Sequence, residues 1–485
     1  MDKTIQQILK EDYLKWYDKD YIFTRTEDRF IPKTFGRTID DVLAISEYLL
    51  SLGLENKNIA IYGVNSYEWM VSDLAAMGYV GVSVTLDKSW TFYDVANALK
   101  LTEIKCLIYS PSQEAVVKLL KKNFDILYIS TGSDFQYALE KGRKILENKK
   151  DKFDFKAKAF DKMSKIVFSS GTTGNPKAVM LSQKNMLMGF ENLMRRAPMT
   201  EDDSCFLFLP LHHTYAGLYN FLFSIISGIS IYICSDNSKI AEEIMMANPT
   251  IVSVVPLILE RFFNAVKDKK SYAKALFGKN IKYVFCGGVK LDNNIKEFFQ
   301  NSGLDIIEAY ALSETASSLS IQYSGNHNPE SVGIIFDNIE VKISEPDSEG
   351  VGEILVRGDN VFLGYFNNKE ATDDAFDENS FFKTGDLGKI DEKNNIYLTG
   401  RKKRIILMSN GENVYPEEIE ALICEYNEVT KAKILYEDGE IKAKLYINKN
   451  ADIARIIDSV NEKLPKYSQI SSFEAMDDSI DNRIK

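Results

Sequence analysis

The sequence predicts an α/β protein in which a largely parallel sheet is covered by helices, with a β-rich part after it. Short apolar runs, typical of buried strands, alternate with stretches that space their apolar residues as a helix does. The alternation continues on both sides of a Gly/Ser/Thr-rich loop at residues 169–177. Near residue 338 it is replaced by strands between Gly, Asp and Asn turns, which favours an antiparallel unit.

The first alternation lies before the loop. Helical spacing over residues 40–52 ends at Gly53, and Ser66 can cap a second helix that ends near Gly78. A third helix is predicted over residues 93–101. The predicted strands of this part are residues 58–64, 80–86, 106–109 and 126–129.

A second alternation follows the loop. A buried helix over residues 218–227 is predicted to stop at Gly228. The strands predicted here are residues 229–234, 251–255, 282–286 and 305–308, and those of the antiparallel unit are residues 338–344, 352–357 and 395–399. Beyond Gly400 a small α+β part is predicted, with helices at 416–426 and 451–464 and a hairpin of residues 431–436 and 440–448. We therefore expect domains of residues 1–400 and 401–485.

Composition excludes several classes of function. The net charge of −11 argues against non-specific nucleic-acid binding and against a polybasic membrane anchor. The five cysteines form no C-x-x-C pair, which is typical of buried thiols in a reducing compartment, and the three histidines lack metal-ligand spacing. Residues 1–20 lack a signal-peptide core, and the longest apolar stretch, residues 219–234, is too short to cross a bilayer. We expect a soluble, cytoplasmic protein.

The loop at residues 169–177, Ser-Ser-Gly-Thr-Thr-Gly-Asn-Pro-Lys, has the composition of a phosphate-binding loop. It follows an apolar strand, residues 165–168, and precedes residues 179–185, in which Ser182 can cap a helix. Small residues let backbone amides approach an anion, the hydroxyls add donors, and Lys177 adds a cation. The spacing G-x-x-G-x-x-K differs from the Walker pattern, which argues against a P-loop NTPase. The alternative interpretation is a surface turn.

Six stretches together resemble the adenylate-forming (AMP-binding) superfamily of acyl- and aryl-CoA synthetases, amino-acid adenylation domains and luciferases. They are residues 169–177, 208–214, 286–289 with 308–315, 352–358 with 364–366, 384–388, and 400–405 with 411–420. They occur in the family's order over about residues 55–485, and residues 61–69 look most like the long-chain acyl-CoA synthetase branch. The resemblance implies a large N-terminal adenylate-forming domain of βα layers with a β-rich subdomain, and a small mobile α+β C-terminal domain.

The resemblance also implies a reaction in which a carboxylate and ATP form acyl-AMP and pyrophosphate, and the acyl group then passes to a thiol. The implied cofactors are ATP, Mg²⁺ and CoA, or the phosphopantetheine of a carrier protein. The loop residues implied to bind the ATP phosphates are Ser169, Ser170, Gly171, Thr172, Thr173 and Gly174. Lys177 would hold the leaving pyrophosphate, with Thr172 and Glu314 as Mg²⁺ ligands. On spacing alone, Glu314 would be a surface or ion-paired residue.

Residues further along the chain are implied to bind the rest of the nucleotide. They are Gly287, Gly288, Glu308, Ala309, Tyr310, Ser313, Asp386 and Arg401. By resemblance, Tyr310 stacks on the adenine, Asp386 accepts hydrogen bonds from the ribose hydroxyls, and Arg401 reaches the same ribose. Core packing is the alternative for Tyr310, and a simple turn is the alternative for Asp386.

Three further positions take their roles from the resemblance. His213, in preference to His212, would line the passage between the acyl and thiol sites. Lys403 would be the hinge about which the C-terminal domain swings between the two steps; the alternative is one member of a solvated basic run. Arg483 stands where the family has its adenylation lysine, and an arginine is planar and bulkier than a lysine. Either Arg483 serves in a weakened adenylation step, or the chain ends early, or adenylation has been lost.

The predicted function is that of an AMP-forming acid–thiol ligase that activates a medium- or long-chain fatty acid and transfers it to CoA. The stretch around His213 lacks the Asp with which amino-acid-activating relatives hold an ammonium group, which favours an acid without an α-amine. One alternative is an acyl-AMP ligase that loads a carrier protein. The other is a nucleotide- or acyl-binding relative disabled at Arg483. The expected partners are small molecules, with no nucleic acid and no transmembrane segment.

Overall fold

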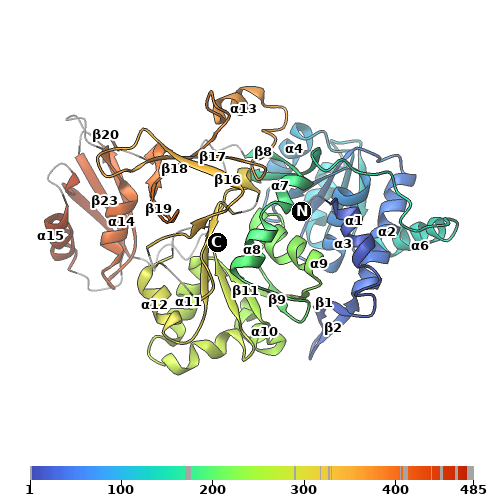
Figure 1. The fold of residues 1–485 in the computed structure, drawn as a ribbon, viewed down its shortest axis with the longest axis horizontal. Helices are drawn as coiled ribbons and strands as arrows, with labels where there is room; N and C mark the ends of the chain where they lie inside the picture. Colours follow the sequence, from blue (N-terminus) through green and yellow to red (C-terminus); the bar gives the residue numbers. More distant parts are fainter. Residues whose placement is uncertain are drawn as a thin grey trace. The chain divides into compact units, whose positions relative to one another are not determined.

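The computed structural model describes residues 3–169, 176–288, 291–316, 318–325, 328, 330–404, 406–407, 413–437, 440–447, 452–464 and 468–477. The chain forms two compact units (Figure 1). The larger comprises Met1–Glu340 and Arg357–Phe382, and the smaller comprises Val341–Val356 and Lys383–Lys485. The boundary predicted at residues 400–401 stays a prediction.

One sheet of the larger unit has the strand order β6-β5-β3-β4-β7-β8. Its strands are β3 (Asn58–Tyr62), β4 (Val82–Leu86), β5 (Cys106–Tyr109), β6 (Leu127–Ser130), β7 (Met163–Ser169) and β8 (Lys177–Ser182). All neighbours are parallel except β7 and β8, which are antiparallel. The middle strands are almost entirely buried and mostly apolar, as a parallel sheet covered on both faces requires.

The second sheet of the larger unit has the order β15-β14-β13-β12-β11-β9-β10-β1-β2. Its strands are β1 (Asp20–Arg25), β2 (Phe30–Thr34), β9 (Ser204–Leu207), β10 (Ser230–Ile233), β11 (Ile251–Val254), β12 (Tyr283–Cys286), β13 (Ile306–Tyr310), β14 (Ser320–Ile321) and β15 (Ile334–Ile335). The run from β1 to β13 is parallel, and β2, β14 and β15 extend it antiparallel at the two edges.

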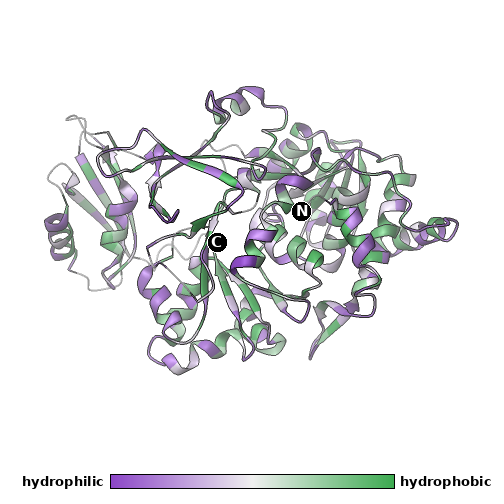
Figure 2. Cartoon of the chain, in the orientation of Figure 1, coloured by the Kyte–Doolittle hydropathy of each residue, from purple (hydrophilic) through white to green (hydrophobic). Residues whose placement is uncertain are grey.

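Helices connect these strands and cover the sheets. In the larger unit the described helices include α1 (Ile5–Asp12), α2 (Phe35–Ser51), α3 (Tyr67–Ala75), α4 (Phe92–Leu101), α5 (Glu114–Leu120), α6 (Phe135–Leu146), α7 (Gln183–Leu187), α8 (Phe190–Arg196), η3 (Tyr215–Leu222), α9 (Phe223–Ser227), α10 (Ile240–Ala247), α11 (Pro256–Val266), α12 (Asn293–Gln300) and α13 (Lys369–Ala375). Figure 2 shows strands that are largely apolar and helices that carry polar residues along one side. The helices are therefore amphipathic, with one apolar side available to pack on the sheets.

Several predicted helix ends are confirmed. Ser66 caps α3 by accepting a hydrogen bond from the Trp69 amide, and Ser182 caps α7 by accepting one from the Asn185 amide. Gly228 ends α9 with φ of 68°, a left-handed conformation that favours glycine. The stop predicted near Gly78 is also close: α3 ends at Ala75, and a π-helical turn, Ala76–Val80, continues it two residues past that glycine.

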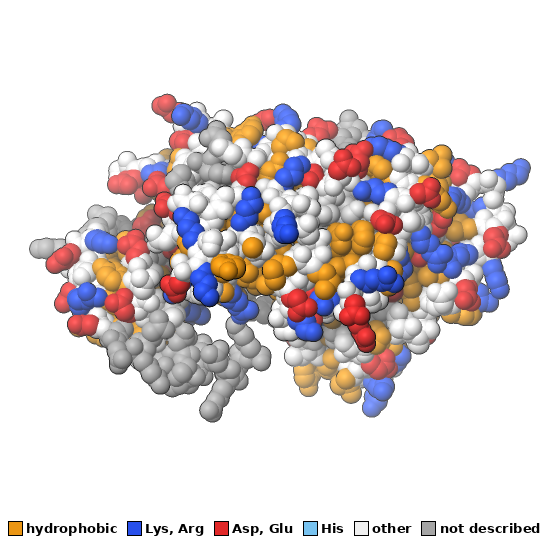
Figure 3. All heavy atoms as spheres, turned by 90° about the horizontal axis from the view of Figure 1, so that it is seen from below, with side chains coloured by type: hydrophobic (Ala, Val, Ile, Leu, Met, Phe, Trp, Pro, Cys, Tyr) orange, Lys and Arg blue, Asp and Glu red, His pale blue; other side chains and the backbone are white. Residues whose placement is uncertain are grey.

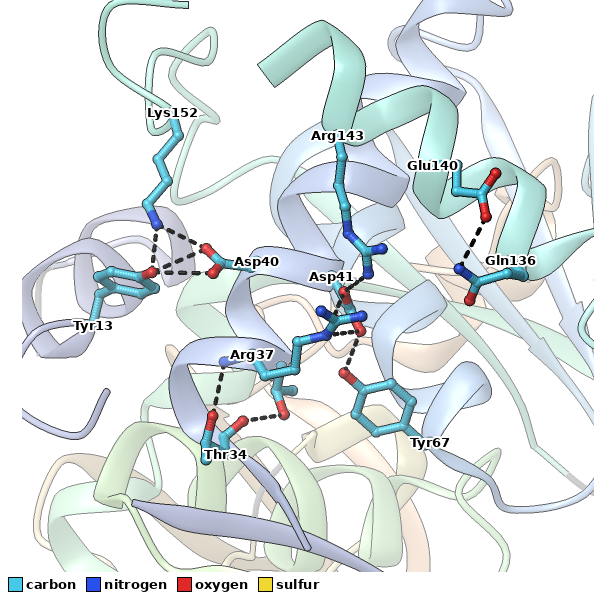
Figure 4. Close-up of polar contacts among 11 residues, drawn as sticks. Tyr13, Thr34, Arg37, Asp40, Asp41, Tyr67, Gln136, Glu140, Arg143 and Lys152 are labelled. Carbon is cyan, nitrogen blue, oxygen red and sulfur yellow. Dashed lines mark hydrogen bonds and ion pairs between the residues drawn. The ribbon is translucent and has the colours of Figure 1, made fainter. Parts of the chain in front are cut away.

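The buried carboxylate of Asp41 links three helices of the larger unit (Figure 4). On α2, Arg37 pairs with Asp41, and from α6 the Arg143 guanidinium lies 2.6 Å from its Oδ1. The Tyr67 hydroxyl at the start of α3 donates to Oδ2 at 2.8 Å. Helices α2 and α6 lie side by side, and this charge-paired cluster fixes their contact (Figure 1).

The smaller unit contains a sheet in the order β16-β17-β18-β19 and a sheet in the order β22-β23-β24. Its strands and helices include β16 (Ile339–Ser344), β17 (Gly352–Gly358), β18 (Phe382–Ile390), β19 (Ile396–Arg401), α14 (Pro416–Cys424), β22 (Val429–Glu437), β23 (Glu440–Ile447), α15 (Ile453–Lys463) and β24 (Ser472–Asp477). Helices α14 and α15 pack on the second sheet around a core of Ile, Val, Leu and Ala side chains. The predicted hairpin of β22 and β23 is confirmed, whereas β18 and β24 were not predicted.

The surface carries mixed charge. On the face drawn in Figure 3, Lys and Arg side chains lie among Asp and Glu side chains. Within the described residues, no helix combines the length and the apolar character needed to cross a membrane.

Candidate active site

The two ends of the predicted phosphate loop are held side by side. Ser169 is the last residue of β7 and Lys177 is the first residue of β8, and the two are paired in the antiparallel register. The loop therefore joins two strands, and the helix that Ser182 caps begins only after β8. The loop residues Ser170, Gly171, Thr172, Thr173 and Gly174 lie outside the described residues, so their predicted contacts to phosphate stay predictions.

Glu314 lies close to this hairpin. It is on the short helix η7 (Ser313–Thr315), which packs against β7 and β8, and only 8% of it is exposed. The Tyr365 hydroxyl donates a hydrogen bond to Glu314 Oε1 at 3.0 Å. The Lys177 Nζ lies over the same tyrosine ring, 4.5 Å from its centroid. Tyr365 thus bridges the predicted metal ligand and the predicted phosphate-binding lysine, which are far apart in the sequence.

Backbone pairing fixes this arrangement. The segment at residues 362–366 runs along β8, where the Phe366 amide donates to the Ala178 carbonyl and the Leu363 amide donates to the Met180 carbonyl. The Phe362 amide donates to the Glu314 carbonyl at 2.8 Å. Burial, followed by the charge of Glu314 and its hydrogen bond, raises the pKa of Tyr365 well above its usual value. The phenol is therefore protonated, and a donor, at any physiological pH.

The residues around Glu314 fit a magnesium ion bound together with a nucleotide. Among the described residues, no group of three or more His, Cys, Asp or Glu side chains is placed to hold a metal ion. Mg²⁺ needs no such group, because it is usually held by one or two carboxylates, water and substrate phosphates. Glu314 next to the phosphate loop supplies one such carboxylate.

The strand β13 carries three of the residues predicted to bind the nucleotide. Glu308 forms a buried ion pair with Lys296 of α12, and the Gln322 side chain accepts a hydrogen bond from its amide. Tyr310 is buried at the end of the strand, and its carbonyl accepts from the Leu319 amide at 2.7 Å. The charge of Glu308 is therefore neutralised by the fold itself.

The glycines after β12 lie next to β13. A Cβ on Gly287 would meet the Ala309 carbonyl at 3.5 Å and the Tyr215 ring at 3.8 Å, which are ordinary contact distances. Gly288 has φ of 93°, a conformation that other residues rarely adopt. The structure thus brings Gly287 and Ala309 together, as a shared nucleotide pocket requires, while their role in binding stays a prediction.

The two histidines after β9 differ in their surroundings. The rings of His212 and His213 lie 4.1 Å apart, and His212 Nε2 lies 3.5 Å from Asp87 Oδ2. This contact with His212 lowers the pKa of Asp87 well below its usual range. Desolvation, and then the neighbouring His212, lowers the pKa of His213 to about 4, although part of its ring reaches the surface. His213 is therefore neutral near pH 7.

The residues predicted to bind the ribose lie in the smaller unit. Asp386 of β18 and Arg401 of β19 face each other in the register, and Arg401 Nε lies 2.6 Å from Asp386 Oδ1. Gly385 has φ of 72°, and the Thr384 hydroxyl accepts from the Asp386 amide. The structure joins the two predicted residues, while their contact with a ribose stays a prediction. Lys403 lies in the helical turn η8 (Lys402–Arg404), but its side chain and Arg483 lie outside the described residues.

Sequence reasoning missed three partners of the predicted residues. Lys296 neutralises Glu308, Asp87 contacts His212, and Tyr365 holds Glu314. Tyr365 belongs to one of the six recognised stretches, so its position was available although no role was assigned to it. The other two follow no motif, because each partnership depends on the packing of separate elements.

Comparison with known proteins connects this geometry with a family. A family model described as "AMP-binding enzyme" matches residues 16–366. The long-chain-fatty-acid–CoA ligase FadD15 of Mycobacterium bovis is 26% identical over 473 residues, which cover 86% of this chain and 78% of the relative. The 2-succinylbenzoate–CoA ligase of Enterococcus faecalis is 25% identical over 440 residues, covering 88% and 86%.

A solved structure shows the same fold. The o-succinylbenzoate coenzyme A synthetase of Bacillus subtilis, in complex with ATP and a magnesium ion, superposes with a TM-score of 0.80 at 22% identity, covering 97% of this chain and 95% of that chain. The predicted α/β adenylate-forming fold is confirmed. The family model spans more than half of the chain and includes the hairpin, Glu314 and Tyr365. The chain therefore belongs to the AMP-binding enzyme family.

Proposed function

We propose that this enzyme activates a fatty acid with ATP and transfers the acyl group to CoA. The observation that carries the proposal is the placement of Glu314 and Lys177 on either side of Tyr365, at the base of the phosphate loop. The site thus combines a buried carboxylate and a cation next to a Gly/Ser/Thr-rich loop, which suits a nucleotide with its metal. The CoA ligase names of the relatives support the same reaction class.

The first step needs charge neutralisation more than it needs a base. The acid is already ionised near pH 7, so its carboxylate attacks the α-phosphorus directly. Lys177 binds the departing pyrophosphate and offsets its charge. Mg²⁺, when bound, would act as a Lewis acid on the phosphate oxygens, with Glu314 as its protein ligand. Asp386 and Arg401, which are paired in the smaller unit, bind the ribose in this proposal.

The second step transfers the acyl group from AMP to a thiol. AMP is a good leaving group, and a thiol with a pKa of about 8.5 supplies enough thiolate near pH 7. In our proposal His213 lines the thiol passage as a neutral ring and does not act as a base. We also propose that residues 401–485 move about Lys403 between the two steps.

Aromatic and apolar side chains of η3 pack near Gly287. The Tyr215 ring faces Gly287, and Tyr219 follows one turn later on η3 with its hydroxyl bonded to Ser318. Behind Tyr219 lies a small internal cavity of about 10 Å³. Its lining carries no charged side chain and consists of Leu193, Met199, Cys205, Tyr219, Phe223, Ser224, Ser227, Ile229, Ile251, Ser253 and Phe285. This space holds about one water molecule and no alkyl chain, so the choice of a fatty acid is supported by the long-chain-fatty-acid–CoA ligase relative.

ATP–pyrophosphate exchange tests the proposal directly. The purified protein is assayed with medium- and long-chain fatty acids, with aryl acids, with dicarboxylic acids and with amino acids. We expect exchange with fatty acids and none with dicarboxylic or amino acids. Exchange that is best with a dicarboxylic or amino acid would overturn the fatty-acid proposal.

The acceptor and the role of Arg483 need their own measurements. Mass spectrometry of the product with CoA, and separately with a carrier protein, distinguishes a CoA ligase from a carrier-loading enzyme.

Arg483→Lys tests the terminal cation, because lysine is compact where arginine is planar. We expect this variant to exchange faster than the natural protein. If neither exchanges with any acid, the catalytic proposal fails.

A further inference from the structure

Tyr365 contacts both charged groups of the predicted phosphate site. Its hydroxyl donates to Glu314 Oε1 at 3.0 Å, and its ring face lies 4.5 Å from the Lys177 ammonium. The residue is buried, and an isolated bridge pairs its backbone with Val179 of β8. Backbone pairing and burial thus fix the position of Tyr365. Glu314 contacts its hydroxyl, and Lys177 contacts its ring.

We propose that Tyr365 is a positioning residue that holds the Glu314 carboxylate for the metal of the nucleotide and sets the place of Lys177 relative to it. The inference rests on the proposed function for the identity of the nucleotide. It assigns a separate task to each part of the side chain: the hydroxyl orients Glu314, and the ring supports Lys177.

A neutral donor suits this task better than a cation would. A lysine or arginine paired with Glu314 would cancel the negative charge that attracts Mg²⁺, as Lys296 does for Glu308. A phenol fixes one carboxylate oxygen by a hydrogen bond and leaves the net charge in place. Among the described residues none donates to the other oxygen, Oε2, so that oxygen can take the metal.

The ring contact couples the carboxylate to the lysine. A cation over an aromatic face is attracted by the negative face of the ring. The T-shaped packing of Tyr365 against Phe362, with centroids 4.8 Å apart, prevents the ring from swinging away. A change in the ring position would therefore displace Lys177 and Glu314 together.

Two substitutions at Tyr365 separate the two tasks. Tyr365→Phe removes the hydroxyl and keeps the ring, whereas Tyr365→Leu removes both. ATP binding is measured by calorimetry in the absence of any acid, with and without Mg²⁺, so that no turnover occurs. For Tyr365→Phe we expect the Mg²⁺-dependent gain in ATP affinity to fall about tenfold, with the metal-free affinity changed less than about twofold. For Tyr365→Leu we expect the metal-free affinity to fall as well.

The chain offers a matched control in Tyr67. Its hydroxyl also donates to a buried carboxylate, Asp41, but two arginines neutralise that carboxylate (Figure 4). Tyr67→Phe therefore loses a similar hydrogen bond without touching the predicted phosphate site. We expect it to lower the unfolding temperature and to leave the Mg²⁺ dependence of ATP binding unchanged.

A double-mutant cycle decides whether Tyr365 acts through Glu314. In the Glu314→Gln background the carboxylate charge is already gone, so adding Tyr365→Phe is expected to change the Mg²⁺ dependence by less than about twofold. Equal effects of Tyr365→Phe in both backgrounds would overturn the inference, and so would an unchanged Mg²⁺ dependence in Tyr365→Phe alone. Mg²⁺-dependent ATP binding without exchange for any acid would refute the proposed function and leave this inference standing. If the natural protein does not bind ATP, both fail.

Discussion

Two buried glutamates, six positions apart, differ in how their charge is compensated. Glu308, on β13, forms an ion pair with Lys296 inside the fold. Glu314, on the short helix that follows, receives a hydrogen bond from the neutral Tyr365 hydroxyl. Both side chains are less than 10% exposed, so burial alone does not distinguish them. In our proposal the partner, more than the depth, separates the structural carboxylate Glu308 from Glu314, which binds a cation.

The first prediction concerns the carboxylate that the fold neutralises. In Glu308→Gln the Lys296 ammonium stays buried without its counter-charge, which we expect to cost about 3–5 kcal/mol of stability. Urea unfolding followed by fluorescence measures the loss. The double variant Lys296→Met with Glu308→Leu removes both charges and is expected to recover most of it. If Glu308→Gln were as stable as the natural protein, the ion pair with Lys296 would not distinguish Glu308 from Glu314.

The second prediction concerns the carboxylate that keeps its charge. Glu314→Gln retains an acceptor for the Tyr365 hydroxyl but loses the charge for Mg²⁺. We expect ATP–pyrophosphate exchange to fall by about 10²–10³-fold, as for the loss of a charge-stabilising group, with the urea midpoint nearly unchanged. Loss of folding together with activity would place Glu314 with Glu308 as a structural residue.

A third buried carboxylate, Asp41, extends the comparison. Its partners Arg37 and Arg143 are both partly exposed, so they can regain water when the charge is removed. We therefore expect Asp41→Asn to cost about 1–3 kcal/mol, less than Glu308→Gln, and to leave exchange activity unchanged under conditions where the protein is folded. The same urea experiment ranks the two variants. If Asp41→Asn lost more stability than Glu308→Gln, the exposure of the partner cations would not determine the cost of removing a buried carboxylate.

The smallest expected effect involves His213, whose pKa is lowered to about 4 from an ordinary value near 6.5. Between these two values the unfolded chain binds a proton that the folded chain does not, so stability falls as the pH falls through this window. We expect His213→Phe to weaken this dependence slightly, because the ring is partly exposed. Unfolding temperatures from pH 4 to pH 7 measure it. If the unfolding temperature changed with pH equally in the natural protein and in His213→Phe, the lowered pKa of His213 would be contradicted.

The fold was largely predictable where strands are apolar and buried. Strands such as β5 and β12 appear as short runs of Val, Ile, Leu, Phe, Tyr and Cys, and the structure places them in the parallel sheets. Strand β18 was missed because it contains two glycines and reads as a turn. A Cβ on one of them, Gly388, would lie 2.3 Å from the Tyr397 carbonyl, so that glycine permits the close approach of β19.

The strand β8 was missed for a different reason. In residues 179–185 the sequence predicts a helix cap at Ser182, and the three apolar residues before it were not predicted as a strand. In the structure Ser182 does cap a helix, but the residues before it pair with β7 and with the segment at residues 362–366. Local sequence sets the cap, whereas pairing with a segment about 180 residues away completes the strand.

The sequence by itself determined the alternation of strands and helices, the helix caps, and the family, because these depend on short-range spacing and on motifs in a fixed order. It also predicted a phosphate loop and Glu314 as a metal ligand, and both stay predictions. Only the tertiary structure decided which carboxylates are neutralised, since Lys296 and Glu308, or Tyr365 and Glu314, meet through packing between separate elements. Charge compensation depends on distance and burial in space, and spacing along the chain records neither.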